Sequence, residues 1–237
     1  MSQPIKVLSF DLDDTLWPSL PTILRAEDLL FQWLMEHVPV IPQKYDINQL
    51  REKRRSLIKS HPELAHDLTL LRIRSLKLLA EEFQLSQEWI VPAFNIFYEA
   101  RQQVTLFDDV KPVLDELKKT FQLVSLTNGN ASTIKTGVDH WFDFALNSAS
   151  IGKLKSEPDI YWRVQQLANI EAGQMVHIGD DPVHDIAGAR SAGVFAIWLN
   201  RGQRPWCLEY CQPDAVISSL NELPLLLNQR QEKSFNC

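Results

Sequence analysis

The chain has 237 residues, of which 45% are hydrophobic, and its formal net charge is −6. This length suits one large domain or a core with a smaller insertion, and the hydrophobic share suffices for a buried core. No apolar run approaches the roughly 20 residues of a membrane-spanning helix, no signal-peptide pattern opens the chain, and the acidic balance disfavours nucleic-acid binding. We therefore expect a cytoplasmic protein that binds neither membranes nor nucleic acid, and we infer no obligate protein partner.

Apolar and helical segments alternate along most of the chain. The first apolar segment, 5–12, predicts a buried strand that ends at acidic residues. Further strands are predicted at 122–127, 175–179, 194–199 and 215–218. Helical periodicity lies between the strands, at 110–121, 131–139, 158–168 and 182–192. Short strands without polar alternation suit a sheet covered on both faces, so we predict an α/β fold with a doubly wound, Rossmann-like parallel sheet.

One long segment interrupts this alternation. From about residue 18 to residue 105 there is no strand pattern, but apolar residues recur at helical spacing. We predict an α-helical cap over 18–104, inserted after the first strand of a core that comprises 1–17 and 105–237. Trp17, Arg72 and Arg74 are candidate substrate contacts from this part of the chain. For the two arginines, a solvated helix face is the alternative.

Polar side chains follow three of the predicted strands at the point where each strand ends. Asp11 and Asp13 close the first strand, and Thr127 closes the second. Asp180 and Asp185 follow the third. Because ligands of open α/β sheets bind outside the carboxyl ends of the strands, we expect these side chains to meet at one edge.

Not every strand-end aspartate needs a chemical role. Asp14 and Asp181 are predicted to be turn residues or helix caps. Asp11 and Asp13 differ, because the single residue between them lets both side chains leave an extended strand on one face. For Asp185, the alternative is an ordinary helical residue near a helix N-terminus.

Several carboxylates at one edge repel each other, so a positive charge must lie among them. All of the candidate ligands are oxygen atoms, which fits Mg²⁺ together with waters and a substrate phosphate. Lys155, just before a predicted helix, could add an ammonium group that binds phosphate oxygens.

Four segments together resemble the motifs of the haloacid dehalogenase-like (HAD) superfamily. Asp11-Leu-Asp-Asp-Thr15 is similar to the first motif, and Leu126-Thr-Asn-Gly129 to the second. Lys155, followed by Pro158, resembles the third motif, and Gly179-Asp-Asp-Pro-Val-His-Asp185 the fourth. The motifs occur in the family's order and the resemblance extends from about residue 5 to residue 220.

The resemblance implies a role for each of these residues. Asp11 would be the nucleophile, Asp13 the general acid and base, and Thr127 and Lys155 further catalytic residues. Thr127, Asn128 and Lys155 would bind phosphate, while Asp11, Asp13 and Asp180 would hold Mg²⁺, with Asp185 acting through a water. The family often has proline after the motif-three lysine, whereas this chain has Ser156, so Lys153 is the alternative to Lys155.

The family resemblance predicts a phosphoric monoester phosphatase that acts on a small phosphorylated metabolite through an aspartyl-phosphate. Three shorter segments, Pro21–Arg25, His66–Ser75 and Thr127–Asn130, resemble phosphatases of flavin mononucleotide and of 5-amino-6-(5-phospho-D-ribitylamino)uracil. The alternatives are a 2-haloacid dehalogenase, a phosphomutase or phosphotransferase, and a non-catalytic binding protein. Dehalogenation gives no use to Asp13 as an acid or to a metal, so the residues favour the phosphatase.

The cysteines predict no metal site. Cys207, Cys211 and Cys237 form no C-x-x-C pair and have no histidine cluster beside them, which disfavours structural zinc. Cys207 and Cys211 are close enough in sequence for a disulfide, but we expect reduced thiols in a cytosolic protein.

Overall fold

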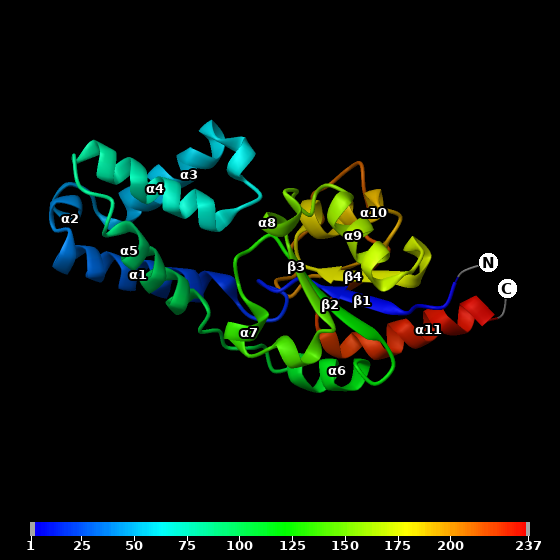
Figure 1. Cartoon of the computed structure of the whole chain (residues 1–237). Helices are drawn as coiled ribbons and strands as arrows, with labels where there is room; N and C mark the ends of the chain where they lie inside the picture. Colours follow the sequence, from blue (N-terminus) through cyan, green and yellow to red (C-terminus); the bar gives the residue numbers. More distant parts are fainter. Residues whose placement is uncertain (1–2, 236–237) are drawn as a thin grey trace. The chain divides into compact units, whose positions relative to one another are not determined.

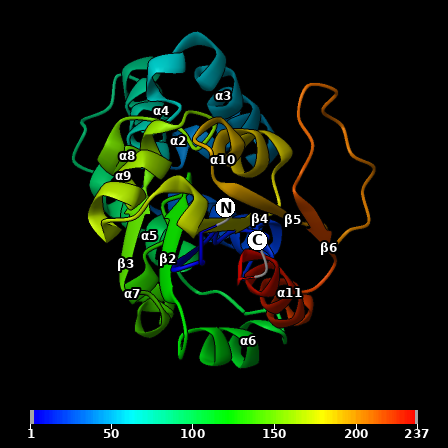
Figure 2. The ribbon, with the colours of Figure 1, turned by 90° about the vertical axis from the view of Figure 1, so that its right-hand side faces the viewer.

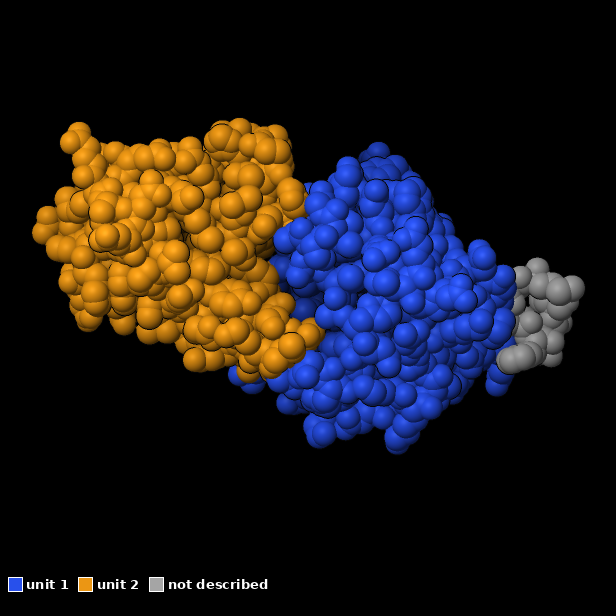
Figure 3. All heavy atoms as spheres, in the orientation of Figure 1, with its two compact units in different colours: residues 1–18, 105–129, 137–237 blue, residues 19–104, 130–136 orange. Residues whose placement is uncertain are grey.

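The structure is a computed structural model that describes residues 3–235 (Figure 1). The chain divides into two compact units, each with its own hydrophobic core. Unit 1 comprises Met1–Pro18, Thr105–Gly129 and Gly137–Cys237, and unit 2 comprises Ser19–Val104 and Asn130–Thr136 (Figure 3). Within the described residues, no helix combines the length and the apolar character needed to cross a membrane.

Unit 1 is built on a parallel sheet of six strands in the order β3-β2-β1-β4-β5-β6. The strands are β1 (Val7–Phe10), β2 (Gln122–Thr127), β3 (Phe144–Asn147), β4 (Met175–Gly179), β5 (Phe195–Leu199) and β6 (Ala215–Ile217). Every residue of β1 and β4 is buried, as expected of central strands that are covered on both faces. The predicted doubly wound α/β fold is confirmed.

Helices cover both faces of this sheet (Figure 2). Helix α9 (Asp159–Ala168) and the short helix α10 (Gly188–Ser191) lie on one face, and α6 (Val110–Leu117) and α11 (Leu223–Phe235) lie on the other. On the first face, Ile160 and Val164 of α9 share a buried cluster with Val7 and Val124 of the sheet. The remaining helical segments of unit 1 are α8 (Ser148–Ile151), η2 (Asp139–Trp141), η3 (Ala172–Gln174), η4 (Pro182–Ala187) and η5 (Leu220–Glu222).

The structure differs from the predicted elements in several places. Strand β3 was not predicted, because this edge strand has only four residues and none of them is fully buried, which leaves no apolar run to detect. The predicted helix at 131–139 was wrong over most of its length: only α7 (Thr133–Thr136) is helical, and Gly137 follows with a φ of 77°. Helix α11 has no counterpart among the predicted elements.

Unit 2 is helical, and its main core comes from three helices. Its helices are α1 (Ser19–His37), α2 (Val40–Lys44), α3 (Ile47–Ser60), η1 (Pro62–Leu64), α4 (Leu68–Glu82), α5 (Ile90–Arg101) and α7. Ala26 and Leu34 of α1, Leu79 of α4 and Phe97 of α5 belong to one buried cluster. Asp46 caps α3 by accepting a hydrogen bond from the Gln49 amide at 2.9 Å, which explains where that helix begins.

The register of the sheet determines where the polar residues emerge. Phe10 of β1 pairs with Ser125 of β2 on one side and with Ile178 of β4 on the other. The residues just beyond these positions therefore leave the sheet at a common edge, the carboxyl edge of three adjacent strands.

Candidate active site

Three carboxylates meet at the carboxyl edge of unit 1. Asp11 follows β1, and its amide donates to the Ile178 carbonyl at 2.9 Å. Asp180 follows β4, and Asp185 lies in η4. One oxygen atom from each of Asp11, Asp180 and Asp185 lies within 4.8 Å of the others. The structure thus brings together three carboxylates that the sequence had placed at strand ends.

Lys155 lies among these carboxylates. Its side chain is buried, and its Nζ donates to the carboxylate of Asp11 and to Asp185 Oδ1, the latter at 2.6 Å. Lys153, the alternative, is half exposed and pairs with Glu157 at 2.7 Å. Of the two lysines that the sequence left open, the structure therefore places Lys155 at the candidate site and Lys153 on the surface.

Two glycines allow the backbone and side chains of the site to approach this closely. A Cβ atom at Gly188 would lie 1.7 Å from the carbonyl oxygen of Lys155, and one at Gly179 would lie 2.2 Å from Cγ of Asp185. Neither distance can hold a carbon atom, so both positions require glycine. The sequence shows both glycines, but only the folded structure explains why a larger residue would not fit at these positions.

Burial and mutual charge set the pKa values of these groups. Burial raises the pKa of Asp11 well above its usual range, and the carboxylates of Asp185 and Asp180 add to this while Lys155 opposes it. Burial also disfavours ionisation of Asp185, but Lys155 and His177 hold its pKa below the usual value. Burial, together with Asp185, raises the pKa of Asp180 to about 7. The site therefore has more acidic groups than its single lysine can neutralise.

Asp180 is held by contacts on its backbone and its side chain. Trp198 Nε1 donates to its carbonyl at 2.8 Å, and Arg204 Nη2 lies 3.2 Å from its Oδ2. Neither Trp198 nor Arg204 was singled out from the sequence, because both come from segments after the four motifs.

Asp13 is oriented by Trp17. The indole Nε1 of Trp17 donates to Asp13 Oδ1 at 2.9 Å, and the Trp17 side chain is fully buried. Trp17 was a candidate substrate contact, but here its ring is buried and its polar atom donates to Asp13. Between them, Asp14 has a φ of 58°, in the left-handed region that aspartate tolerates, which agrees with its predicted place in a turn.

Thr127 and Asn128 close strand β2 beside the lysine. Thr127 is buried, and its Oγ1 accepts from the Gly129 amide at 2.9 Å. Asn128 Oδ1 accepts from the Lys155 amide at 2.9 Å and also from the Ser148 hydroxyl. The Asn128 oxygen thus fixes the backbone that carries Lys155, a structural task that the sequence did not predict.

The segment that carries Asp185 is a π-helical turn, η4, where the sequence predicted part of a regular helix at 182–192. Asp181 caps this turn, because its Oδ1 accepts from the amides of Val183 and His184, each at 2.8 Å. The predicted capping role of Asp181 is confirmed. Asp185 Oδ2 in turn accepts from the Asp181 amide at 2.9 Å. Asp185 points inward from this turn and is fully buried. Single π-helical turns of this kind are frequent at functional sites.

A buried pair behind the site, Ser9 and His177, holds Asp185 from the opposite side. His177 Nε2 lies 3.1 Å from Asp185 Oδ1, and His177 Nδ1 lies 2.8 Å from the Ser9 hydroxyl. Burial lowers the pKa of His177, which favours the neutral ring. Because a carboxylate can only accept, Nε2 carries the proton and Nδ1 accepts from Ser9. The place of His177 within the buried strand β4 agrees with this supporting role, whereas no local pattern in the sequence points to Ser9.

We expect His177→Phe to slow the reaction catalysed at this site about tenfold and to weaken the binding of a divalent cation, because Asp185 loses a donor in a buried site. The measurement is turnover against the concentration of added divalent cation. Ser9→Ala should lower the rate and weaken cation binding to a smaller extent. Lower thermal stability with an unchanged rate and an unchanged cation requirement would restrict His177 to packing.

The donor set suits a hard divalent cation. The three carboxylates offer oxygen atoms only, and they outnumber the two cations that pair with them, Lys155 and the half-exposed Arg204. No histidine or cysteine joins a group of potential metal ligands within residues 3–235. Cys207 and Cys211 form no disulfide, and Cys237 lies outside the described residues.

Comparisons with known proteins point to one enzyme family. A model of the haloacid dehalogenase-like hydrolase family matches residues 5–193. The 5-amino-6-(5-phospho-D-ribitylamino)uracil phosphatase YigB of Escherichia coli (strain K12) is 30% identical over 199 residues, which cover 82% of this chain and 83% of YigB. N-acylneuraminate-9-phosphatase of Mus musculus is 33% identical over 132 residues, 53% of each chain. A crystal structure of a 2-haloacid dehalogenase from Pseudomonas syringae pv. Tomato DC3000 aligns with a TM-score of 0.88 at 37% identity, covering 95% of this chain and 99% of that chain.

Proposed function

Because the chain belongs to the haloacid dehalogenase-like hydrolase family, we propose that it is a Mg²⁺-dependent phosphatase of a small phosphorylated metabolite. The observation that carries the proposal is the pair Asp11 and Asp13. Asp11 lies against Lys155 and two further carboxylates, while Asp13 is oriented separately by the Trp17 indole. Two acids in different surroundings can take different tasks, one as nucleophile and one as proton donor.

The reaction then runs in two steps on these side chains. A carboxylate oxygen of Asp11 attacks phosphorus, the bond from phosphorus to the ester oxygen breaks, and Asp13 gives its proton to the departing alkoxide. In the second step Asp13 takes a proton from water as the water attacks the aspartyl-phosphate. The new bond to phosphorus releases inorganic phosphate and returns Asp11 as a carboxylate and Asp13 as an acid.

The other residues of the site support these steps. Thr127 and Lys155 are proposed to bind phosphate oxygens, with Lys155 fixed by Asn128 and Asp185. Asp11, Asp180 and the backbone of Asp13 would hold Mg²⁺, with Asp185 behind a water. The bound ion would offset the charge of the phosphoryl group and of the carboxylates.

Both phosphatases and 2-haloacid dehalogenases occur among the similar proteins, so two reactions must be compared. Displacement of halide from carbon expels an anion that needs no proton and no metal. It would leave Asp13 without a task, and it would leave Asp11, Asp180 and Asp185 as repelling neighbours. Cleavage of a phosphate ester uses both an acid for the alkoxide and a cation for the phosphoryl charge, so these residues favour the phosphatase.

For the substrate we propose 5-amino-6-(5-phospho-D-ribitylamino)uracil or flavin mononucleotide. The first is the substrate named for YigB, which aligns over most of both chains. The second has a similar chemistry, a ribityl phosphate on a planar heterocycle. Unit 2 occupies the position in the sequence of the predicted cap, and we assign the choice of substrate to it.

The test is release of inorganic phosphate from a panel with Mg²⁺, comprising both proposed substrates, sugar phosphates and nucleotides. We expect the highest kcat/KM for a ribityl phosphate on a heterocycle. Halide release from 2-chloropropionate, measured beside it, tests the alternative chemistry. Halide release without phosphate release would overturn the proposal, whereas phosphate release only from other esters would retain the reaction and replace the substrate.

A further inference from the structure

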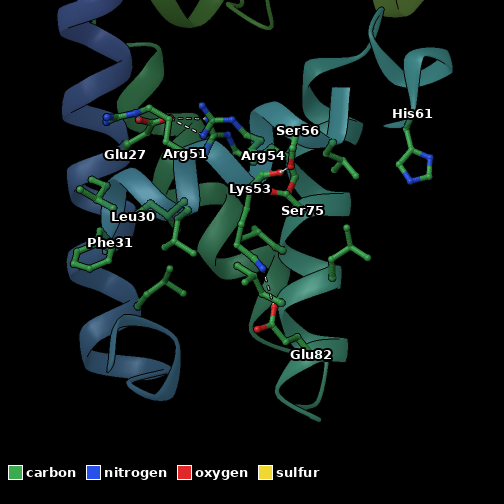
Figure 4. A pocket seen from close by; sticks show the side chains of 18 of the residues that line it. Glu27, Leu30, Phe31, Arg51, Lys53, Arg54, Ser56, His61, Ser75 and Glu82 are labelled. Carbon is green, nitrogen blue, oxygen red and sulfur yellow. Dashed lines mark hydrogen bonds and ion pairs between the residues drawn. The ribbon is translucent and has the colours of Figure 1, made fainter. Parts of the chain in front are cut away.

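Unit 2 contains a cavity of about 420 Å³ between helices α1, α3 and α4 (Figure 4). Much of its lining is aliphatic or aromatic, including Leu30 and Phe31 of α1, Leu50 of α3 and Leu79 of α4. A cavity of this size holds a small organic molecule and not only a few waters. All of its lining residues belong to unit 2, so the cavity is a property of that unit alone.

One part of the lining carries an unusual concentration of guanidinium groups. Glu27 of α1 is buried, and its Oε2 accepts from Arg51 Nε at 2.7 Å. Its Oε1 lies 2.6 Å from Arg54 Nη1 and 3.4 Å from Arg72 Nη2. Figure 4 shows the Arg51 and Arg54 side chains reaching from α3 toward Glu27. Three arginines thus face a single carboxylate.

The surplus of positive charge is not cancelled elsewhere in the lining. The only other acidic lining residue is Glu82, and it is paired with Lys53 at 3.1 Å and with Lys44 at 2.7 Å. The lining thus contains four lysine or arginine side chains and two carboxylates, and His61 is left out of this count.

The arginines also have donors to spare. A guanidinium has five N–H donors, and Arg54 makes one ion-pair contact, through Nη1 to Glu27. Arg72 lies over the Phe97 ring, 3.3 Å from its centroid, so one face of its guanidinium is covered. Burial and the neighbouring Arg54 lower the pKa of Arg72 to about 9, although Glu27 opposes this. An added anion would relieve the crowding of like charges.

We propose that this cavity is a binding site for an organic anion that joins a carboxylate or phosphate head to an apolar body. The head would lie against Arg51 and Arg54, whose planar forks match such groups in a bidentate manner. The body would lie against the leucines and Phe31. Both arginine side chains remain partly exposed, at 18% and 19%, so a ligand can reach them.

The two arginines that the sequence offered as candidate substrate contacts, Arg72 and Arg74, differ in their surroundings. Arg72 belongs to the lining of the cavity, whereas Arg74 is half exposed and pairs with Glu81 at 3.0 Å. The site goes beyond the reaction proposed for unit 1, and neither depends on the other.

The experiment is isothermal titration of the full-length protein with two probes that are not phosphate esters, 2-naphthoate and octanoate. Acetate supplies the head alone and 2-naphthol the body alone, and both should bind at least about tenfold more weakly than 2-naphthoate. Arg54→Met should weaken 2-naphthoate binding about tenfold, because one charge-assisted contact is lost. Arg55→Met is the matched control: Arg55 neighbours Arg54 on α3, pairs with exposed Glu52, and does not line the cavity.

Glu27→Gln should change the affinity for 2-naphthoate in the opposite direction to Arg54→Met. It removes the internal carboxylate that competes for the guanidinium groups, so 2-naphthoate should bind about threefold more tightly. A substitution that merely loosened the helices would weaken binding in both Glu27→Gln and Arg54→Met. Absence of binding by either anionic probe, equal affinity in Arg54→Met and Arg55→Met, or loss of binding in Glu27→Gln would each overturn the proposal.

Discussion

Asp11→Asn should lower phosphate release by at least about a thousandfold while the protein still folds. The asparagine keeps the shape of the side chain but lacks the carboxylate oxygen that attacks phosphorus. It removes one of three mutually repelling carboxylates and also the ion pair between Asp11 and Lys155, so we expect only a small change in thermal stability. The measurement is single-turnover phosphate release beside a thermal melt, with the best substrate of the panel.

Asp14→Asn is the matched control for this experiment. Asp14 lies three residues further along, is exposed, and adopts a left-handed conformation that asparagine also tolerates. We expect it to retain most of the activity. If Asp11→Asn kept turnover near the level of Asp14→Asn, Asp11 could not be the nucleophile.

Removal of divalent metal should abolish activity, and Mg²⁺ should restore it. Without a cation, burial and the neighbouring Asp185 and Asp180 raise the pKa of Asp11, which disfavours the ionised form that attacks phosphorus. The phosphoryl charge would also lose its counter-ion, so we expect a loss of about a hundredfold or more, or about 3 kcal/mol. Phosphate release is measured after dialysis against chelator and again during titration with Mg²⁺.

Asp180→Asn tests whether the Asp180 carboxylate is responsible for the dependence on Mg²⁺. It should raise the Mg²⁺ concentration for half-maximal activity about tenfold or more, because an amide oxygen is a weaker ligand than a carboxylate. Circular dichroism of the chelated protein separates loss of metal from loss of fold. Full activity in excess chelator would remove the metal from the proposal, and an unchanged Mg²⁺ requirement in Asp180→Asn would remove Asp180 as a ligand.

Much of the candidate site could be located from sequence because its parts are local signals at strand ends. Buried strands such as β1 and β4 are continuous apolar runs, and the carboxyl edge of a parallel sheet gathers whatever follows them. Asp11 and Asp180 were therefore expected to lie near each other without any structure. The edge strand β3 gave no such signal, since it is short and only half buried.

The sequence by itself determined the α/β class, the family motifs and the strand-end acids, because periodicity and short spacings are properties of neighbouring residues. Tertiary structure decided which lysine lies at the site, since Lys155 meets Asp11 across 144 positions of the chain. It also decided that Trp17 serves Asp13, that Ser9 and His177 support Asp185, and that three arginines surround Glu27. Such contacts depend on how distant elements pack and on close approach at positions such as Gly188, which no local pattern encodes.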